Sequence, residues 1–150
     1  MTDEDFMRLA IEAAREGIRK GEMPFGACVV MNGRVIATTH NSARLMMDTT
    51  AHAEVQAIRE ASRRLAALEL AGSIVYTSCE PCPMCFSACA WARVSKIVYA
   101  ARIEDASRAG IRQIPITSDQ MRHLSRSEMH LIADVLRNES LEVFKAWARL

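Results

Sequence analysis

The sequence has little net charge, few aromatic residues and no long hydrophobic run. Its 150 residues carry a formal net charge of +1, and 5% of them are aromatic, although half are hydrophobic. A chain with so little net charge has no strong field that attracts a polyanion at long range. No window is apolar enough to span a membrane, and residues 1–5 are too acidic for a secretory signal. We therefore expect one globular domain over residues 1–150, located in the cytoplasm.

Cysteine is present in an odd number and is unevenly distributed. Four of the five cysteines lie in one short stretch, at positions 79, 82, 85 and 89. A chain of this length can bury a core without disulfides, so clustered thiols indicate a reducing compartment. Clustered reduced thiols also suggest a metal-binding site.

Hydrophobic spacing and turn residues predict the order of the elements. Apolar side chains recur at helical spacing behind the capping hydroxyl of Thr2 until Gly21. Two β-branched runs, 26–31 and 34–39, flank Asn32-Gly33 and predict a hairpin. The other expected elements are helices over 50–68 (capped by Thr50), over 83–93 and from near Glu104, strands over 73–77, 96–101 and 130–135, and a last helix capped by Asn138.

This order indicates an α/β fold in which helices cover a mixed sheet. The strands alternate with helical segments, and the hairpin adds an antiparallel pair. Pro115 prevents a long helix between the last two strands. Residues 144 and 147 are expected to form a packing stripe on the last helix.

Three metal ligands and one carboxylate carry the predicted chemistry. Cys82 and Cys85 are three residues apart in a helix opened by Pro83, so both sulfurs share one face near a helix N-terminus that favours thiolates. With His52 they supply the three ligands that a catalytic zinc uses, because its fourth position stays open. Glu54 would stand beside that position as a proton carrier. The set predicts hydrolytic deamination of an amino-substituted heterocycle, because it matches the zinc-deaminase pattern H-x-E…P-C-x-x-C.

Two non-enzymatic alternatives use the same thiols. Cys79, Cys82, Cys85 and Cys89 also have the C-x2-C-x2-C-x3-C spacing of iron–sulfur proteins. That alternative leaves the histidine–glutamate pair unexplained, and Ala90 stands where the motif has proline. A structural zinc with four protein ligands is the other alternative.

Four segments of the chain resemble the cytidine deaminase superfamily, in the branch of guanine, cytosine and tRNA adenosine deaminases. They are residues 24–27, 50–54, 78–85 and 91–93, and the resemblance is close from residue 23 to about residue 110. It implies a three-layer fold with a five-stranded mixed sheet between helices, a Zn²⁺ cofactor and a homodimer. By position, the zinc ligands are His52, Cys82 and Cys85, and the proton shuttle is Glu54.

The resemblance also implies a set of contacts with a base. Asn41 matches an asparagine that hydrogen-bonds the substrate, and Phe25 and Trp91 match side chains that line the base pocket. The backbone amide of Ala53 and the backbone of Glu80 match two further contacts.

Guanine is the substrate that the resemblance favours. Phe25, the cysteine-rich run 79–85 and the segment 91–93 look more like guanine deaminases than like tRNA deaminases. Where guanine deaminases have an acidic residue, this chain has Gln113, which we expect to contact the base with a different donor pattern. Cytosine or a nucleoside is the first alternative substrate. A tRNA adenosine deaminase is the second, disfavoured by the neutral charge and the absence of a basic tail.

Overall fold

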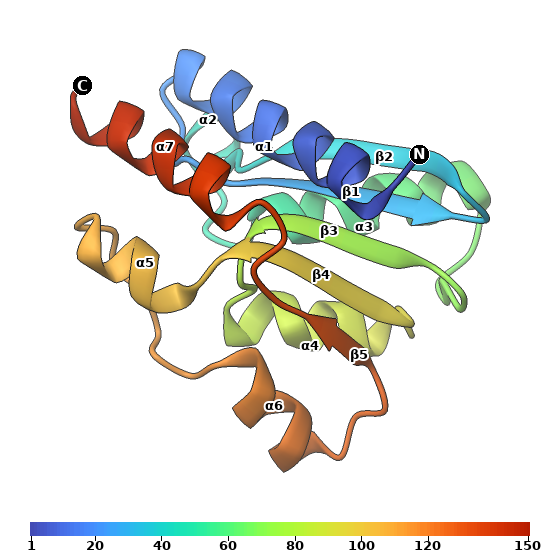
Figure 1. Ribbon diagram of the computed structural model, residues 1–150. Coiled ribbons are helices and arrows are strands. Elements are labelled where there is room, and N and C mark those ends of the chain that lie inside the picture. Colours follow the sequence, from blue (N-terminus) through green and yellow to red (C-terminus); the bar gives the residue numbers. More distant parts are fainter.

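The computed structural model describes residues 1–150 and shows one sheet between two layers of helices (Figure 1). The strand order is β2-β1-β3-β4-β5. Strand β1 pairs antiparallel with β2 and β3, whereas β4 pairs parallel with β3 and β5. The predicted mixed five-stranded sheet is therefore confirmed. The strands are β1 (Gly26–Met31), β2 (Arg34–His40), β3 (Ile74–Cys79), β4 (Lys96–Ala101) and β5 (His130–Ile132).

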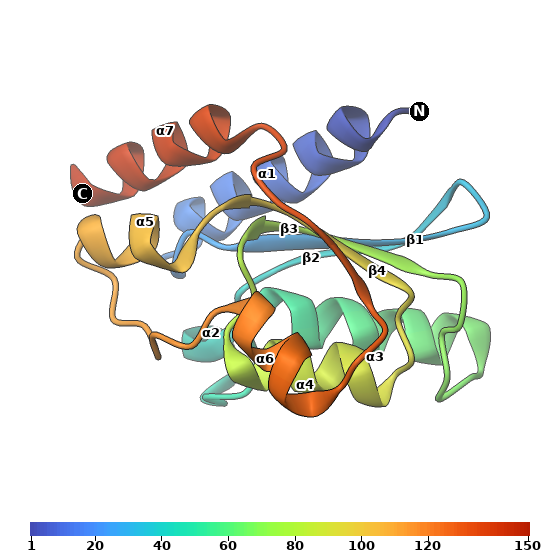
Figure 2. The ribbon, with the colours of Figure 1, turned by 60° about the horizontal axis from the view of Figure 1, so that its bottom comes forward.

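The helices divide between the two faces of the sheet (Figure 2). Helices α1 and α7 cover one face, and α3, α4 and α6 cover the other. None of the helices combines the length and the hydrophobicity that a membrane crossing requires. The helices are α1 (Asp3–Arg19), α2 (Ala43–Met46), α3 (Ala53–Leu65), α4 (Pro83–Trp91), α5 (Ile103–Arg108), α6 (Ser118–Ser125) and α7 (Arg137–Ala148).

The central strands β1, β3 and β4 are buried on both faces because their side chains alternate between two cores, whereas the edge strands β2 and β5 are more exposed. Val29 and Ile97 pack in the cluster that includes residues of α3 and α4. Their neighbours Cys28 and Val98 pack in the cluster with α1 and α7. Cys28 is thus a core residue. A third cluster, which contains Phe144, lies between the end of the sheet, α5 and α7.

Local signals at the N-terminal half were correct. Thr2 and Asp5 form a reciprocal capping box at the start of α1. Asn32 and Gly33 have φ angles of 51° and 72°, as a two-residue type I′ hairpin turn requires. The hairpin is therefore confirmed.

Two predicted helix caps are wrong. The Thr50 hydroxyl donates to Asp48 Oδ1 at 2.6 Å, and the N-cap of α3 is His52. Helix α7 begins before Asn138, and its N-cap is Leu136 in the left-handed conformation. At Thr50, the contact with Asp48 in the preceding loop takes the place of a cap.

Helix α6 was not predicted, and β5 is shorter than expected. Thr117 and Gln120 form a capping box at the start of α6. The pattern of a hydroxyl residue followed three positions later by glutamine is a helix-start signal that the sequence does contain. Strand β5 ends at Ile132 because only three residues pair with β4.

Gly26 is the position of closest approach between α1 and the sheet. A Cβ atom here would overlap the carbonyl oxygen of Ala10 and lie 2.5 Å from the amide nitrogen of Ala14. We predict that Gly26→Ala lowers the free energy of unfolding by about 3 kcal/mol, because α1 must shift. Gly33→Ala is the control, since its φ is +72° but nothing lies within 4 Å, so we expect a loss of only about 1 kcal/mol. Equal losses in urea denaturation would contradict this assignment.

Candidate active site

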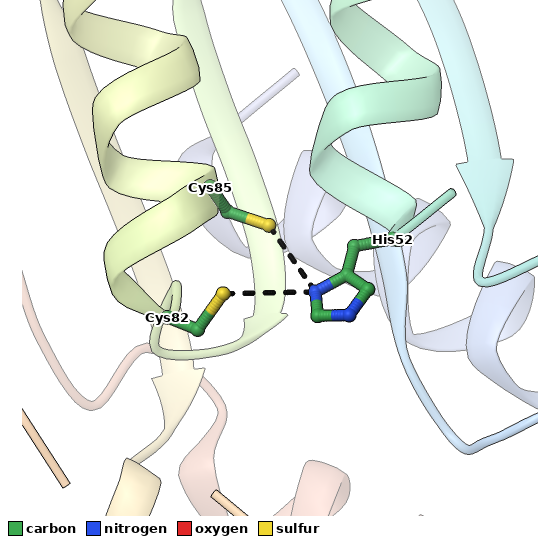
Figure 3. A group of neighbouring side chains, drawn as sticks. All are labelled: His52, Cys82 and Cys85. Carbon is green, nitrogen blue, oxygen red and sulfur yellow. Dashed lines mark hydrogen bonds between the residues drawn. The ribbon is translucent and has the colours of Figure 1, made fainter. Parts of the chain in front are cut away.

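His52, Cys82 and Cys85 point toward one another at the edge of the sheet where β3 ends (Figure 3). The sulfur of Cys82 lies 3.6 Å, and that of Cys85 3.5 Å, from Nδ1 of His52. With Zn–S of about 2.3 Å and Zn–N of about 2.0–2.1 Å, sulfur and nitrogen ligands of a tetrahedral zinc are about 3.6 Å apart. The three donor atoms therefore fit three corners of a zinc tetrahedron.

Two helix N-termini bring these ligands together. His52 is the N-cap of α3 and Cys82 is the N-cap of α4, both with extended backbone. Neither side chain caps its own helix, so both remain available to a metal. Cys85 lies one turn into α4, and Pro83 fixes the first helical position between the two sulfurs.

The two thiols have pKa values that move in opposite directions. Hydrogen bonds from Cys85 and His52 lower the pKa of Cys82 to about 4, even though its burial acts the other way. The same bond to Cys82, and then burial, raise the pKa of Cys85. One thiolate is therefore available at neutral pH, and metal binding would displace the proton of the second.

The other clustered cysteines are not ligands. The sulfur of Cys79 lies 3.7 Å from the carbonyl oxygen of Arg102, and Cys89 is fully buried in the core beneath α4. The metal-binding group consists of His52, Cys82 and Cys85. A four-cysteine iron–sulfur site and a closed four-ligand zinc site are thus both contradicted.

Glu54 is a buried carboxyl group in the first turn of α3. It is 6% exposed, and its Oε1 accepts a hydrogen bond of 2.8 Å from the Thr77 hydroxyl. Burial, and then the nearby Cys82 thiolate, raise the pKa of Glu54. A carboxyl group with a raised pKa is suited to accept and return a proton near neutral pH. The sequence analysis did not identify Thr77 as part of the site. The available signal was a hydroxyl side chain within an otherwise apolar strand.

A pocket of about 310 Å³, partly open to solvent, lies in front of the metal ligands. Larger pockets, of about 1080 and 970 Å³, lie elsewhere on the surface, but neither contains a cysteine. The chemistry therefore places the site at the smaller cavity. Its lining consists of Phe25, Asn41, His52, Glu54, Cys79, Glu80, Cys82 and Gln113.

Most residues expected to contact a base lie at this cavity. Phe25, Asn41, Glu80 and Gln113 all line it. Ala53 is the first residue of α3, so its N–H belongs to the turn that lacks helical acceptors.

Trp91 is not among the residues of this chain that line the cavity, so its contact with a base stays a prediction. Helix α4 runs away from the metal ligands, and Trp91 is its last residue, about 9 Å along the axis from Cys85. Its side chain is 86% exposed. Trp91 is close to the zinc ligands in sequence, but it lies at the other end of α4 and is therefore distant from them in space.

Glu80 has a structural task in addition to its place at the cavity. Its carboxylate accepts hydrogen bonds from the N–H groups of Ile103, at 3.2 Å, and Ser118, at 2.8 Å. These groups open α5 and α6, so the Glu80 side chain joins both helices to the end of β3.

Comparison with known proteins agrees with this geometry. Residues 1–101 match the family model of the cytidine and deoxycytidylate deaminase zinc-binding region. The chain belongs to this family of deaminases. The chain is an enzyme that removes an amino group from its substrate by hydrolysis. Its cofactor is zinc.

Individual relatives differ in substrate. Bacillus subtilis guanine deaminase is 48% identical over 111 residues, which are 73% of this chain and 71% of that protein. The tRNA-specific adenosine deaminase of the same organism is 33% identical over 147 residues, covering 98% of this chain and 89% of that protein. A solved structure of guanine deaminase from Nitrosomonas europaea superposes with a TM-score of 0.89 at 27% identity, covering 98% of this chain and 85% of that one.

We predict that Cys82→Ala abolishes stoichiometric zinc binding, because it removes one of three protein ligands. The variant should also unfold at a lower temperature, since metal binding is coupled to folding. Cys89→Ala is the matched control, because Cys89 is buried in the same helix but outside the ligand group. Metal analysis that finds full zinc in Cys82→Ala, or equal zinc loss in both variants, would contradict the ligand assignment.

Proposed function

We propose that this deaminase acts on a free nucleobase, with guanine as the leading candidate, and releases xanthine and ammonia. The observation that carries the proposal is the lining of the cavity, which contains aromatic, amide and carboxyl groups but no lysine or arginine. Such a lining suits a neutral planar molecule. The likeness to Nitrosomonas europaea guanine deaminase over 98% of the chain supports this choice.

Glu54 is the residue that we propose to move protons during the reaction. It takes a proton from water as the water oxygen bonds to the amine-bearing ring carbon, and it passes that proton to a ring nitrogen. It then transfers the second water proton to the amine as the carbon–nitrogen bond breaks and ammonia leaves. Zinc, held by His52, Cys82 and Cys85, supplies the Lewis acidity that lets water ionise near neutral pH. Thr77 keeps the Glu54 carboxyl in place through its 2.8 Å hydrogen bond.

Three other groups are proposed to hold the base. Asn41 is 4% exposed, and its Oδ1 accepts the Ala43 N–H at 3.0 Å, so its Nδ2 is left to donate to the substrate. Phe25 offers an apolar wall and packs edge-on against Phe144 at a centroid distance of 5.9 Å. The free N–H of Ala53 would donate beside the reacting carbon.

A tRNA adenosine deaminase is the second candidate. The observation in its favour is that the Bacillus subtilis tRNA-specific enzyme matches 98% of the chain. A flipped nucleotide would need a groove with basic walls for its phosphates. Deamination of cytosine or of a nucleoside needs no such groove and stays a further alternative. Assembly as a homodimer and a cytoplasmic location remain predictions.

The substrate proposal is tested by measuring ammonia release from guanine, cytosine, adenine, their nucleosides and a tRNA with an exposed adenosine. We expect the highest kcat/KM for guanine. Glu54→Gln is the matched control, because it keeps the shape of the side chain and the zinc but removes the proton carrier. Its turnover should fall by about 10³-fold. Deamination of the tRNA without activity on guanine would overturn the proposal, and full turnover by Glu54→Gln would overturn the mechanism.

We predict that Gln113→Asp raises the preference for guanine over the next best base by about 10-fold, the range of one charged hydrogen bond. The Gln113 amide donates to the Arg112 carbonyl at 3.0 Å, whereas an aspartate would accept from the ring N–H and amino group of guanine. The ratio of kcat/KM values measures the effect. Gln56→Asp, on α3 outside the cavity, is the control and should leave the ratio unchanged. An unchanged ratio in Gln113→Asp would place this residue outside the base contact.

A further inference from the structure

Glu22 is a buried carboxylate that the proposed reaction does not use. It lies between α1 and β1 and is 2% exposed. Its Oε2 accepts the N–H of Arg44 at 3.1 Å, and its Oε1 accepts the N–H of Leu45 at 2.6 Å. Both oxygens are therefore bound to the first turn of α2, which lies in the segment between β2 and α3.

Helix α2 does not cap itself. Its N-cap residue, Ser42, makes no side-chain cap and donates to the His40 carbonyl at 3.2 Å. The Asn41 Oδ1 takes the Ala43 N–H, and Glu22 takes the next two N–H groups. Without these acceptors, the first N–H groups of α2 would have no partner in the protein. They would then bind water, or the turn would adopt another conformation. Glu22 is thus the remote side chain that holds this turn.

The turn in its present position decides which end of the Asn41 amide faces the cavity. Because Oδ1 is occupied by the Ala43 N–H, only the Nδ2 donors are available to a base. If the turn moves, the amide can reverse and present its oxygen instead. The backbone of Asn41 is fixed as well, since its N–H donates to the Phe25 carbonyl at 3.0 Å.

A second contact joins the same two segments. The Arg44 guanidinium donates to the Gly21 carbonyl at 3.1 Å, so the segment before β1 and the start of α2 are joined from both sides. Glu22 and Asn41 are therefore linked through the backbone of residues 43–45, whose N–H groups they accept, and the link does not pass through the metal ligands.

We propose that Glu22 is a positioning residue that orients the Asn41 amide with its donors toward the substrate. The pocket then selects a base that carries a hydrogen-bond acceptor, a ring nitrogen or a carbonyl oxygen, at that place. This inference rests on the proposed function, in that Asn41 must contact the base.

A double-mutant cycle tests the proposal, using the substrate that the wild-type enzyme deaminates fastest in the ammonia assay. We expect Glu22→Gln to raise KM about 10-fold while kcat changes less than about two-fold, since only binding orientation is lost. Zinc content should stay unchanged. In an Asn41→Ala background, Glu22→Gln should raise KM by no more than about two-fold, because coupled residues are not additive. Glu16→Gln, an exposed carboxyl change on α1, is the control and should leave KM unchanged.

The cycle separates positioning from a general structural role. Hydrogen exchange of the Arg44 and Leu45 amides should become faster in Glu22→Gln, whereas exchange in β3 should not change. If Glu22→Gln does not fold, Glu22→Asp keeps the charge with a shorter reach and takes its place in the cycle. An unchanged KM, or effects of Glu22 and Asn41 that multiply independently, would overturn the proposal. A wild-type enzyme active on tRNA but not on guanine would overturn the proposed substrate alone, and the same cycle would then be measured with tRNA.

Discussion

The structure depends on two helix N-termini that meet at the carboxyl end of the parallel pair β3 and β4. His52 and Cys82 are the N-caps of α3 and α4, and their ligand atoms are 3.6 Å apart. This separation is a property of how the two helices pack on the sheet, so any shift of either helix would change the metal geometry. The central strands beneath them, β1, β3 and β4, are buried on both faces and hold the two helices in place.

Around this point, buried carboxylates are satisfied by fixed donors. Glu54 accepts from Thr77, and Glu80 accepts from the first N–H groups of α5 and α6. Glu22 does the same for α2. Buried charges without partners would be costly, so each pairing ties one segment to the next. Hydrogen bonds to carboxyl groups thus join β3 to Glu54 and to the starts of α5 and α6, and join the segment before β1 to the start of α2.

Some of the fold could be predicted from local sequence because the signals were strong and unopposed. The capping box at Thr2 and the Asn32-Gly33 turn needed no distant partner, and both were correct. The caps predicted at Thr50 and Asn138 are wrong, since the N-caps of α3 and α7 are His52 and Leu136. The Thr50 hydroxyl donates to Asp48 instead, and the capping preference of a residue type does not take such a contact into account.

The sequence by itself determined the reaction class, because the spacing of two cysteines on one helix turn and the histidine–glutamate pair leave few other chemistries. Only the tertiary structure decided which residues share the pocket. It placed Trp91 at the far end of α4, outside the lining of the cavity within this chain, and it brought Thr77 and Glu22 into contact with other segments. Spacing along a chain fixes what lies on one helix face, whereas contacts between segments far apart depend on how whole elements pack.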